Sequence, residues 1–133
     1  MEDSSATFLQ IDLQSLFGSG RSRKMDFDKI WEHFNSRETE FLTGAFIYSI
    51  KSHDFDSSRF ETKLRSIGYD LKVKSLPRPI RKKYNDYSPA PHISHVIPVT
   101  IDCISRLDRF DKWILMSNNG EFSDLCRHLK SIG

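Results

Sequence analysis

The chain has 133 residues, of which 38% are apolar and 12% aromatic, and its formal net charge is +2. This length suits one domain with a real core, and the composition excludes an intrinsically disordered chain. The net charge is too small to indicate an anionic partner by itself, so the positions of the basic residues must decide that question.

The sequence also bears on the protein's location. No apolar run approaches the roughly 20 residues needed to cross a bilayer, and the N-terminal residues 1–5 are acidic where a signal peptide would be basic. Cys103 and Cys126 are the two cysteines, and each lies in an apolar-periodic stretch. Cysteines used as small hydrophobic residues are typical of a reducing compartment. We therefore expect a cytoplasmic protein without membrane contact.

The first part of the chain predicts two strands separated by a helix. Residues 1–6 are polar, and we expect a flexible N-terminus there, followed by a strand over residues 7–13 that carries Asp12 near its end. A glycine-containing loop comes next, and Asp26 is placed to cap a helix with one apolar face. Residues 43–50 are almost continuously apolar, which is typical of a central parallel strand covered on both faces.

The middle of the chain predicts a second helix and a strand with one exposed face. The helix begins at Asp54 or Asp56 and ends at Gly68, because apolar residues recur between them at helical spacing and glycine is a common C-terminal stop. The alternating residues 69–76 predict a strand near the edge of the sheet. Prolines between residues 77 and 91 then indicate a long loop.

The last part predicts a helix, a strand and another helix. Pro98 suits the first turn of a helix, whose apolar residues continue to Leu107 with Asp102 among them. Residues 113–116 predict a buried strand, and residues 122–132 predict an amphipathic helix. Strands that alternate with helices, without a hairpin signal, predict an α/β fold with a mostly parallel sheet.

We expect the functional site at the polar turn between the last strand and the last helix. Ligands of open α/β sheets bind at the carboxyl ends of the strands, and Asp12 stands at such an end too. A simpler interpretation is a plain turn followed by an acid that complements the helix dipole. The residues of the turn are Ser117, Asn118, Asn119, Gly120 and Glu121.

Three further polar residues have two interpretations each. Asp102 lies among apolar neighbours, and an unpaired buried carboxylate is costly, so it either faces the strand-end crevice or pairs with a buried partner. His92 and His95 have a spacing that can bind metal, but such histidines are more often exposed loop residues. No cysteine or third histidine lies near in sequence to complete a zinc site, so we do not expect zinc.

Basic residues in two loops are candidates for contacts with a nucleic-acid backbone. Both groups lie beside predicted strand ends, and Tyr84 and Tyr87 are available to stack on bases. The alternative for any run of charges is a solvated surface. The candidate residues are Arg21, Arg23, Lys24, Arg78, Arg81, Lys82 and Lys83.

Several motifs occur in the order and spacing of a known family. They are Asp12-Leu-Gln-Ser-Leu16 after the first strand, Asp102 in a helix, Phe110-Asp111 before the last strand, Ser117-Asn-Asn-Gly-Glu-Phe122 after it, and Leu129-Lys-Ser-Ile-Gly133. The chain resembles the NYN domain of the PIN-like nuclease superfamily, in its LabA-like branch. The resemblance implies a three-layer fold with a central, mostly parallel sheet of four to five strands. We expect a single domain over residues 7–133 that lacks the family's final strand.

The resemblance also implies a metal site. Members of the family bind Mg²⁺ or Mn²⁺ through acids at strand ends, and the metal activates water for attack on a phosphodiester. By this resemblance Asp12 and Asp102 match family acids, and Glu121 stands where the family has Asp. Asn119 and Val96 stand where it has further acids. Replacing a carboxylate by an amide should weaken Mg²⁺ binding sharply.

Two functions follow from the resemblance. The first is a Mg²⁺- or Mn²⁺-dependent endoribonuclease with a degenerate acidic site, in which Asp12, Asp102 and Glu121 bind the metal and Ser117 and Asn119 assist catalysis. The second is an inactive module that keeps the fold and binds RNA or a protein partner. A homodimer that completes its site between two copies is a further alternative.

Overall fold

The computed structural model describes residues 5–18, 25–35, 40–51, 58–75 and 94–132. Its strands form one sheet in the order β3-β2-β1-β4, and every neighbouring pair is parallel. The strands are β1 (Ser5–Asp12), β2 (Glu40–Lys51), β3 (Asp70–Ser75) and β4 (Lys112–Met116). The predicted α/β fold with a parallel sheet is confirmed, and β3 lies at the edge as expected.

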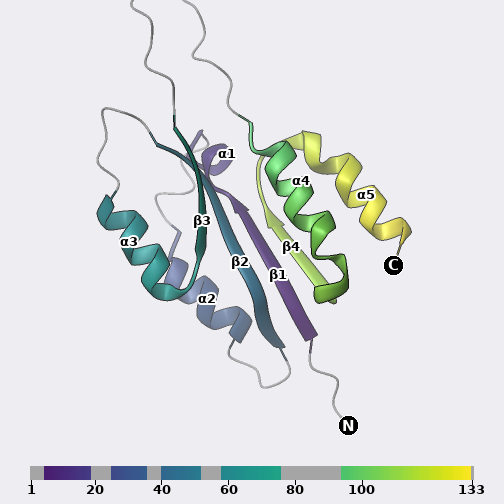
Figure 1. Ribbon diagram of the computed structural model, residues 1–133, viewed down its shortest axis with the longest axis horizontal. Coiled ribbons are helices and arrows are strands. Elements are labelled where there is room, and N and C mark those ends of the chain that lie inside the picture. The colour runs from purple at the N-terminus through teal and green to yellow at the C-terminus, as the bar shows by residue number, and fades with distance from the viewer. Residues whose placement is uncertain (1–4, 19–24, 36–39, 52–57, 76–93, 133) are drawn as a thin grey trace, which may run out of the picture.

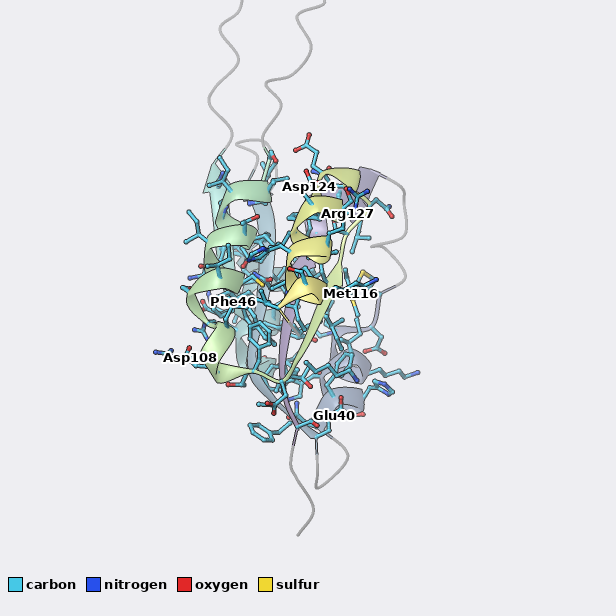
Figure 2. All side chains as sticks on the ribbon, turned by 90° about the vertical axis from the view of Figure 1, so that its right-hand side faces the viewer. Glu40, Phe46, Asp108, Met116, Asp124 and Arg127 are labelled. Atoms are coloured by element: carbon cyan, nitrogen blue, oxygen red, sulfur yellow. The ribbon has the colours of Figure 1, made fainter. Side chains whose placement is uncertain are left out.

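Helices cover both faces of this sheet and give the molecule three layers (Figure 1). One side carries α2 (Phe27–Asn35) and α3 (Ser58–Ile67), and the other carries α4 (Val96–Ser105) and α5 (Ser123–Ser131). Figure 2 looks onto α4 and α5 with the sheet behind them. The 3-10 turns η2 (Leu107–Arg109) and η3 (Gly120–Phe122) precede β4 and α5.

A short helix follows β1 where the sequence predicts only a loop. This helix, α1 (Leu13–Gly18), buries Leu13 and Leu16 in the same core as α2 and α3. A single turn of this length has little stability of its own, so tertiary burial of its leucines holds it in place. The helix starts directly after Asp12 and so shapes the end of β1.

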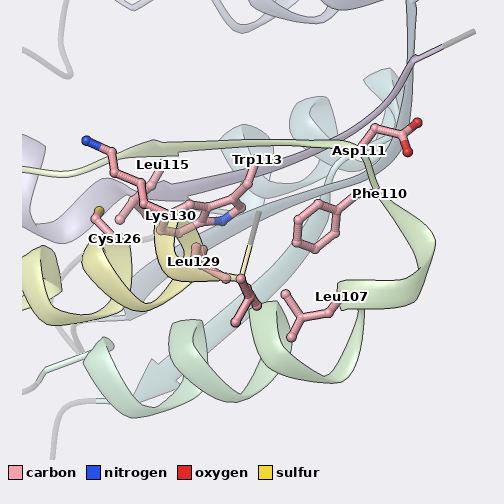
Figure 3. A pocket seen from close by; sticks show the side chains of 9 residues that line it. Leu107, Phe110, Asp111, Trp113, Leu115, Cys126, Leu129 and Lys130 are labelled. Atoms are coloured by element: carbon pink, nitrogen blue, oxygen red, sulfur yellow. The ribbon is translucent and has the colours of Figure 1, made fainter.

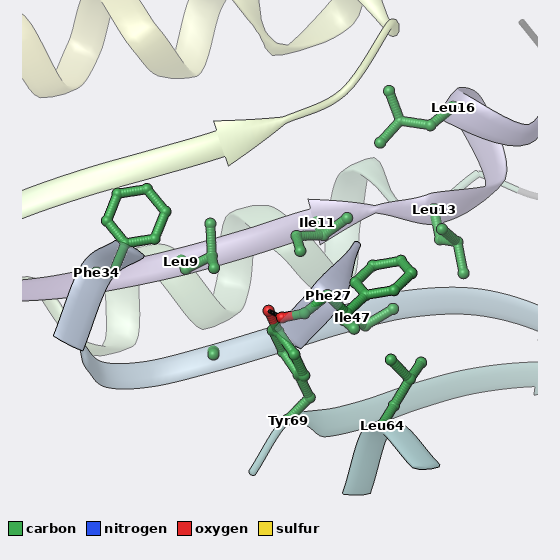
Figure 4. Close-up of a cluster of buried hydrophobic side chains, with 10 residues drawn as sticks. Leu9, Ile11, Leu13, Leu16, Phe27, Phe34, Ile47, Leu64 and Tyr69 are labelled. Carbon is green, nitrogen blue, oxygen red and sulfur yellow. Dashed lines mark hydrogen bonds between the residues drawn. The ribbon is translucent and has the colours of Figure 1, made fainter. Parts of the chain in front are cut away.

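Alternation along β1 divides the core into two clusters. Leu9 and Ile11 belong to the cluster beneath α2 and α3, seen in Figure 4. Phe8, two residues before Gln10, belongs to the cluster beneath α4 and α5. Because successive side chains of a strand point to opposite faces, Gln10 and Asp12 lie on the α4 and α5 side.

Two local signals in the sequence behave as predicted. The Oδ1 atom of Asp26 accepts a hydrogen bond from the main-chain N–H of Lys29 at 3.1 Å, which caps α2. Gly68 ends α3 with a φ of +129°, and a Cβ atom there would lie 2.5 Å from the Trp31 ring. Only glycine fits both constraints. Asp54 and Asp56, the predicted start of α3, lie outside the described residues, and the helix begins at Ser58.

Candidate functional site

Asp12 is buried at the carboxyl end of β1, with 3% of its surface exposed. Its Oδ2 atom accepts a hydrogen bond from Ser117 Oγ at 3.0 Å, across 105 positions of sequence. Parallel pairing of β1 with β4 brings these two strand ends together. The predicted convergence of Asp12 with the turn after the last strand is therefore present.

Two serine hydroxyls link the segments that follow β1 and β4. Ser15 Oγ lies 3.1 Å from Ser117 Oγ, and it accepts the main-chain N–H of Asn118 at 2.9 Å. It also lies 3.1 Å from the main-chain oxygen of Asp12, to which it can donate. Ser117 thus holds the side chain of Asp12, whereas Ser15 contacts the main chain of the same residue.

The remaining turn residues have structural contacts. Asn119 accepts the main-chain N–H of Glu121 through Oδ1 at 3.0 Å, and its own N–H donates to Ser117 Oγ at 3.0 Å. It is therefore the N-cap of η3. Glu121 lies in the first turn of η3 with an exposed side chain. These contacts are those of a turn residue, and the site role of Asn119 stays a prediction.

Asp102 pairs with a buried tyrosine. Its Oδ2 atom accepts a hydrogen bond from Tyr48 Oη at 2.7 Å. Tyr48 Oη in turn accepts a bond from Gln10 Nε2 at 2.8 Å, and Gln10 Oε1 accepts one from Trp113 Nε1 at 2.7 Å. We call Gln10, Tyr48, Asp102 and Trp113 the interior network. Of the two interpretations offered for Asp102, the pairing with a buried partner describes this contact.

The hydroxyl of Tyr48 in the interior network stays protonated. Burial, and then the bond to Asp102, raises the pKa of Tyr48 far above its usual range. Tyr48 therefore keeps its proton at any physiological pH and always donates to Asp102. Gln10 Nε2 also donates to the main-chain oxygen of Val99 at 3.0 Å, so both the amide nitrogen and the amide oxygen of Gln10 are bonded.

His95 is buried, contrary to the expectation from the sequence. The sequence suggested an exposed loop histidine, which is wrong: His95 is the N-cap residue of α4 and only 2% exposed. Its ring packs near Tyr48, with the centroids 5.8 Å apart. Burial lowers its pKa, while the Asp12 carboxylate acts in the opposite direction. The imidazole is therefore neutral at pH 7.

Within the part of the chain that the structure describes, neither ring nitrogen of His95 has a hydrogen-bond partner. Among the described residues, the buried side-chain nitrogen and oxygen atoms without a partner are Thr7 Oγ1 and the two nitrogens of His95. The main chain of Ser49 lies close enough to raise the pKa of His95, but it does not reach hydrogen-bond geometry. We call Asp12, Ser15, Ser117 and His95 the strand-end site.

The described residues do not assemble the metal site that the family resemblance implied. Within the ranges that the structure covers, no three histidine, cysteine, aspartate or glutamate side chains gather so that they could hold a metal ion. Asp12 is at the expected place, Asp102 bonds to Tyr48, and Glu121 is exposed. A site made of these three acids alone does not fit this arrangement.

The predicted RNA-contacting residues are not placed by the structure. Arg21, Arg23, Lys24, Arg78, Arg81, Lys82 and Lys83 all lie outside the described residues, as do Tyr84, Tyr87 and His92. One described cation does stand at a strand end. Lys74 of β3 donates through Nζ to the main-chain oxygen of Ser94 at 3.0 Å, next to His95 in the chain.

The comparison with known families agrees with this geometry. A family model described as the NYN domain matches residues 6–133. The chain belongs to the NYN family. This membership places it in a nuclease-like class, which is the coarse functional class implied by the motifs. No helix among the described residues of this NYN domain is long and apolar enough to cross a membrane.

A solved structure supports the fold of this NYN domain. The chain is similar to a protein of unknown function from Vibrio parahaemolyticus, with a TM-score of 0.71 and 20% sequence identity. The match covers 98% of this chain and 77% of the other. At this identity the likeness concerns the fold alone. No curated protein matches the chain.

A separate hollow in the NYN domain lies away from the strand-end site. A groove of about 870 Å³ runs between β4, η2 and α5 (Figure 3). Its lining is mostly apolar and includes Phe110, Trp113 and Leu129, but none of the strand-end residues. The groove is therefore not part of the candidate site.

Sequence reasoning missed three participants in these two groups. Gln10, Tyr48 and Trp113 were not singled out as network residues. A buried glutamine within an apolar strand was a visible signal, because such a side chain requires partners. Nothing local to Tyr48 indicated its contact with Asp102, which lies 54 positions away in the chain.

Proposed function

We propose that this NYN domain is a divalent-metal-dependent ribonuclease whose essential acid is Asp12. The observation that carries the proposal is the Asp12 carboxylate itself: it is 3% exposed, stands at a strand end, and is oriented by Ser117 Oγ at 3.0 Å. A buried carboxylate is costly unless it is compensated, and among the described residues the Ser117 hydroxyl is the group shown bonded to it. A bound cation would offset that cost, and family membership supplies the class of reaction.

Mg²⁺ or Mn²⁺, when bound, would supply an activated water for attack on a phosphodiester phosphorus. Asp12 contributes negative charge, and Ser117 holds its carboxylate in one orientation. Asn119 keeps the turn in shape through its cap on η3. In this proposal Glu121 adds an exposed acid at the same edge, and Asp102 acts from the interior network.

The RNA backbone would be bound by cations around the strand ends. We retain the seven arginines and lysines of the two loops for this role, and we add Lys74, which stands beside the strand-end site. We also assign the protein to the LabA-like branch and to the cytoplasm. The motif order supports the first assignment, and the two unpaired cysteines support the second.

Two observations favour the second candidate, an inactive module that binds RNA or a protein partner. Asp102 is engaged by Tyr48, and no three metal-binding side chains gather within the described ranges. An eroded site that keeps the fold would have these properties. The two functions differ in whether the folded protein binds metal.

Cleavage of single-stranded RNA with Mn²⁺ present tests the nuclease. Loss of a residue that only supports a metal ligand costs about 10–100-fold, so Asp12→Asn should lower the rate by about 100-fold or more. Asp108→Asn, at an exposed acid of η2, is the matched control and should cleave as the wild type does. Cleavage retained in Asp12→Asn would remove the proposed mechanism.

Thermal unfolding with and without Mn²⁺ separates the nuclease from the module. Metal that binds only the folded state stabilises it by about 2.7 kcal/mol at 100 times the dissociation constant. An unchanged midpoint at millimolar Mn²⁺ would favour the module. A mass twice that of the chain in sedimentation, with metal binding only in that form, would favour a site completed between two copies.

A further inference from the structure

The outer face of α4 is apolar, and α4 stands at the surface of the molecule in Figure 2. Val99 and Cys103 lie on its inner face and are buried in the cluster beneath α4 and α5. Ile97, Ile101 and Ile104 lie on the outer face and are 70%, 59% and 48% exposed. We call these three residues the isoleucine stripe. A helix that is apolar all round is normally buried on all sides, so the stripe indicates a partner.

The other long helices show what a solvated face looks like in this domain. Each carries exposed charged residues, which are Lys29 and Glu32 on α2, Lys63 and Arg65 on α3, and Arg127 and Lys130 on α5. The one charged residue of α4 is Asp102, and its Oδ2 atom accepts the hydroxyl of buried Tyr48 at 2.7 Å. The isoleucine stripe therefore belongs to a helix whose single charge is already bonded in the interior.

The isoleucine stripe is complementary to itself. Its spacing of four and then three residues places the side chains along one face, and it reads almost the same from either end of the helix. A second copy in the reverse direction therefore presents matching isoleucines, so that the ridges of the two helices can interdigitate. The reverse direction also places the positive N-terminal end of one helix beside the negative C-terminal end of the other. An uncharged face offers nothing to a charged partner, and it does not repel an identical face.

We propose that α4 packs against the α4 of a second copy of this chain, as an antiparallel pair on a two-fold axis near Ile101. The inference goes beyond the proposed function, because it concerns the outer face of α4 and holds whether or not the domain cleaves RNA. A helix of this length spans about 15 Å. The pair alone buries less than the roughly 1,200 Å² of a standard interface, so we expect a dimer that dissociates in the micromolar range.

Sedimentation equilibrium of the full chain in metal-free buffer tests the dimer without any variant. Between about 1 µM and about 1 mM, the mass of the wild type should rise from that of one chain to that of two. Ile101→Glu places a charge at the centre of the stripe and should weaken the dimer at least about tenfold, which corresponds to about 1.4 kcal/mol. Phe60→Glu is the control, because Phe60 is a 36% exposed apolar residue of α3, on the other side of the sheet. It should dimerise as the wild type does. A single-chain mass at every concentration, or a dimer unaffected by Ile101→Glu, would overturn the inference.

Disulfide cross-linking tests the direction of the pair. In an antiparallel pair Ile97 of one copy faces Ile104 of the other, so a mixture of Ile97→Cys and Ile104→Cys should form a disulfide between these two positions. Ile97→Cys alone should not link to itself, because a disulfide requires Cβ atoms about 3.5–4.5 Å apart. The oxidised wild type gives the background from Cys103 and Cys126. Self-linked Ile97→Cys, or a mixture without the mixed disulfide, would overturn the antiparallel dimer. Neither result bears on the nuclease, which the cleavage assay of Asp12→Asn tests separately.

Discussion

Gln10 and Asp12 stand two residues apart on the same face of β1, and both are buried, yet their surroundings differ. Both ends of the Gln10 amide are bonded, to Tyr48, Val99 and Trp113. Asp12 accepts the Ser117 hydroxyl, and among the described residues the buried His95 imidazole of the same strand-end site has no hydrogen-bond partner. A satisfied polar network stabilises a core, whereas an incompletely satisfied one marks a place where a ligand is expected.

The largest expected effect lies in the interior network. Gln10→Ala should lower the free energy of unfolding by about 3 kcal/mol, because it leaves a cavity and an unpaired Trp113 N–H. Denaturant unfolding measures this loss. Gln10→Leu keeps most of the volume, so it isolates the hydrogen-bonding part. A Gln10→Leu variant as stable as the wild type would show that the network contributes little.

The next effect concerns the strand-end site. Ser117→Ala removes the hydroxyl that orients Asp12, so Mn²⁺-dependent cleavage should fall by about 10–100-fold while the fold persists. Ser131→Ala is the matched control, because its hydroxyl bonds a main-chain oxygen in the last turn of α5. Equal activity of the two variants would contradict a positioning role for Ser117.

The smallest expected effect is that of Asp102→Asn. It tests whether Asp102 belongs to the interior network or to the metal site. Asp102→Asn replaces a charged acceptor of the Tyr48 hydroxyl by a neutral one, which should cost about 1 kcal/mol of stability. If Asp102 acts from the interior network, cleavage should fall by less than about tenfold. A loss as large as that of Asp12→Asn would place Asp102 at the metal, as the family resemblance implies.

Much of the fold was predictable because it depends on local patterns. The apolar run of β2, the cap at Asp26 and the stop at Gly68 each reflect neighbouring residues, and each is confirmed. The helix α1 was missed, since Leu13 and Leu16 are held by a core that local propensity does not describe.

The candidate site was predictable only in part. Motif order placed Asp12 and Ser117 at strand ends, and the structure joins them by a hydrogen bond. Motif order did not predict the surroundings of Asp102 and His95. Tyr48, the partner of Asp102, is 54 residues away in the chain, and the burial of His95 depends on how α4 docks against β1 and β2.

By itself the amino-acid sequence determined the order of strands and helices, their parallel arrangement and the acid at the end of β1. Periodicity and capping are short-range properties, so they can be read from neighbours along the chain. Only the tertiary structure decided which buried polar groups are satisfied. That outcome depends on side chains up to 105 positions apart that meet within hydrogen-bond distance. Gln10 and Asp102 belong to the bonded interior network, whereas Asp12 and His95 belong to the strand-end site, where the described residues leave the imidazole without a partner.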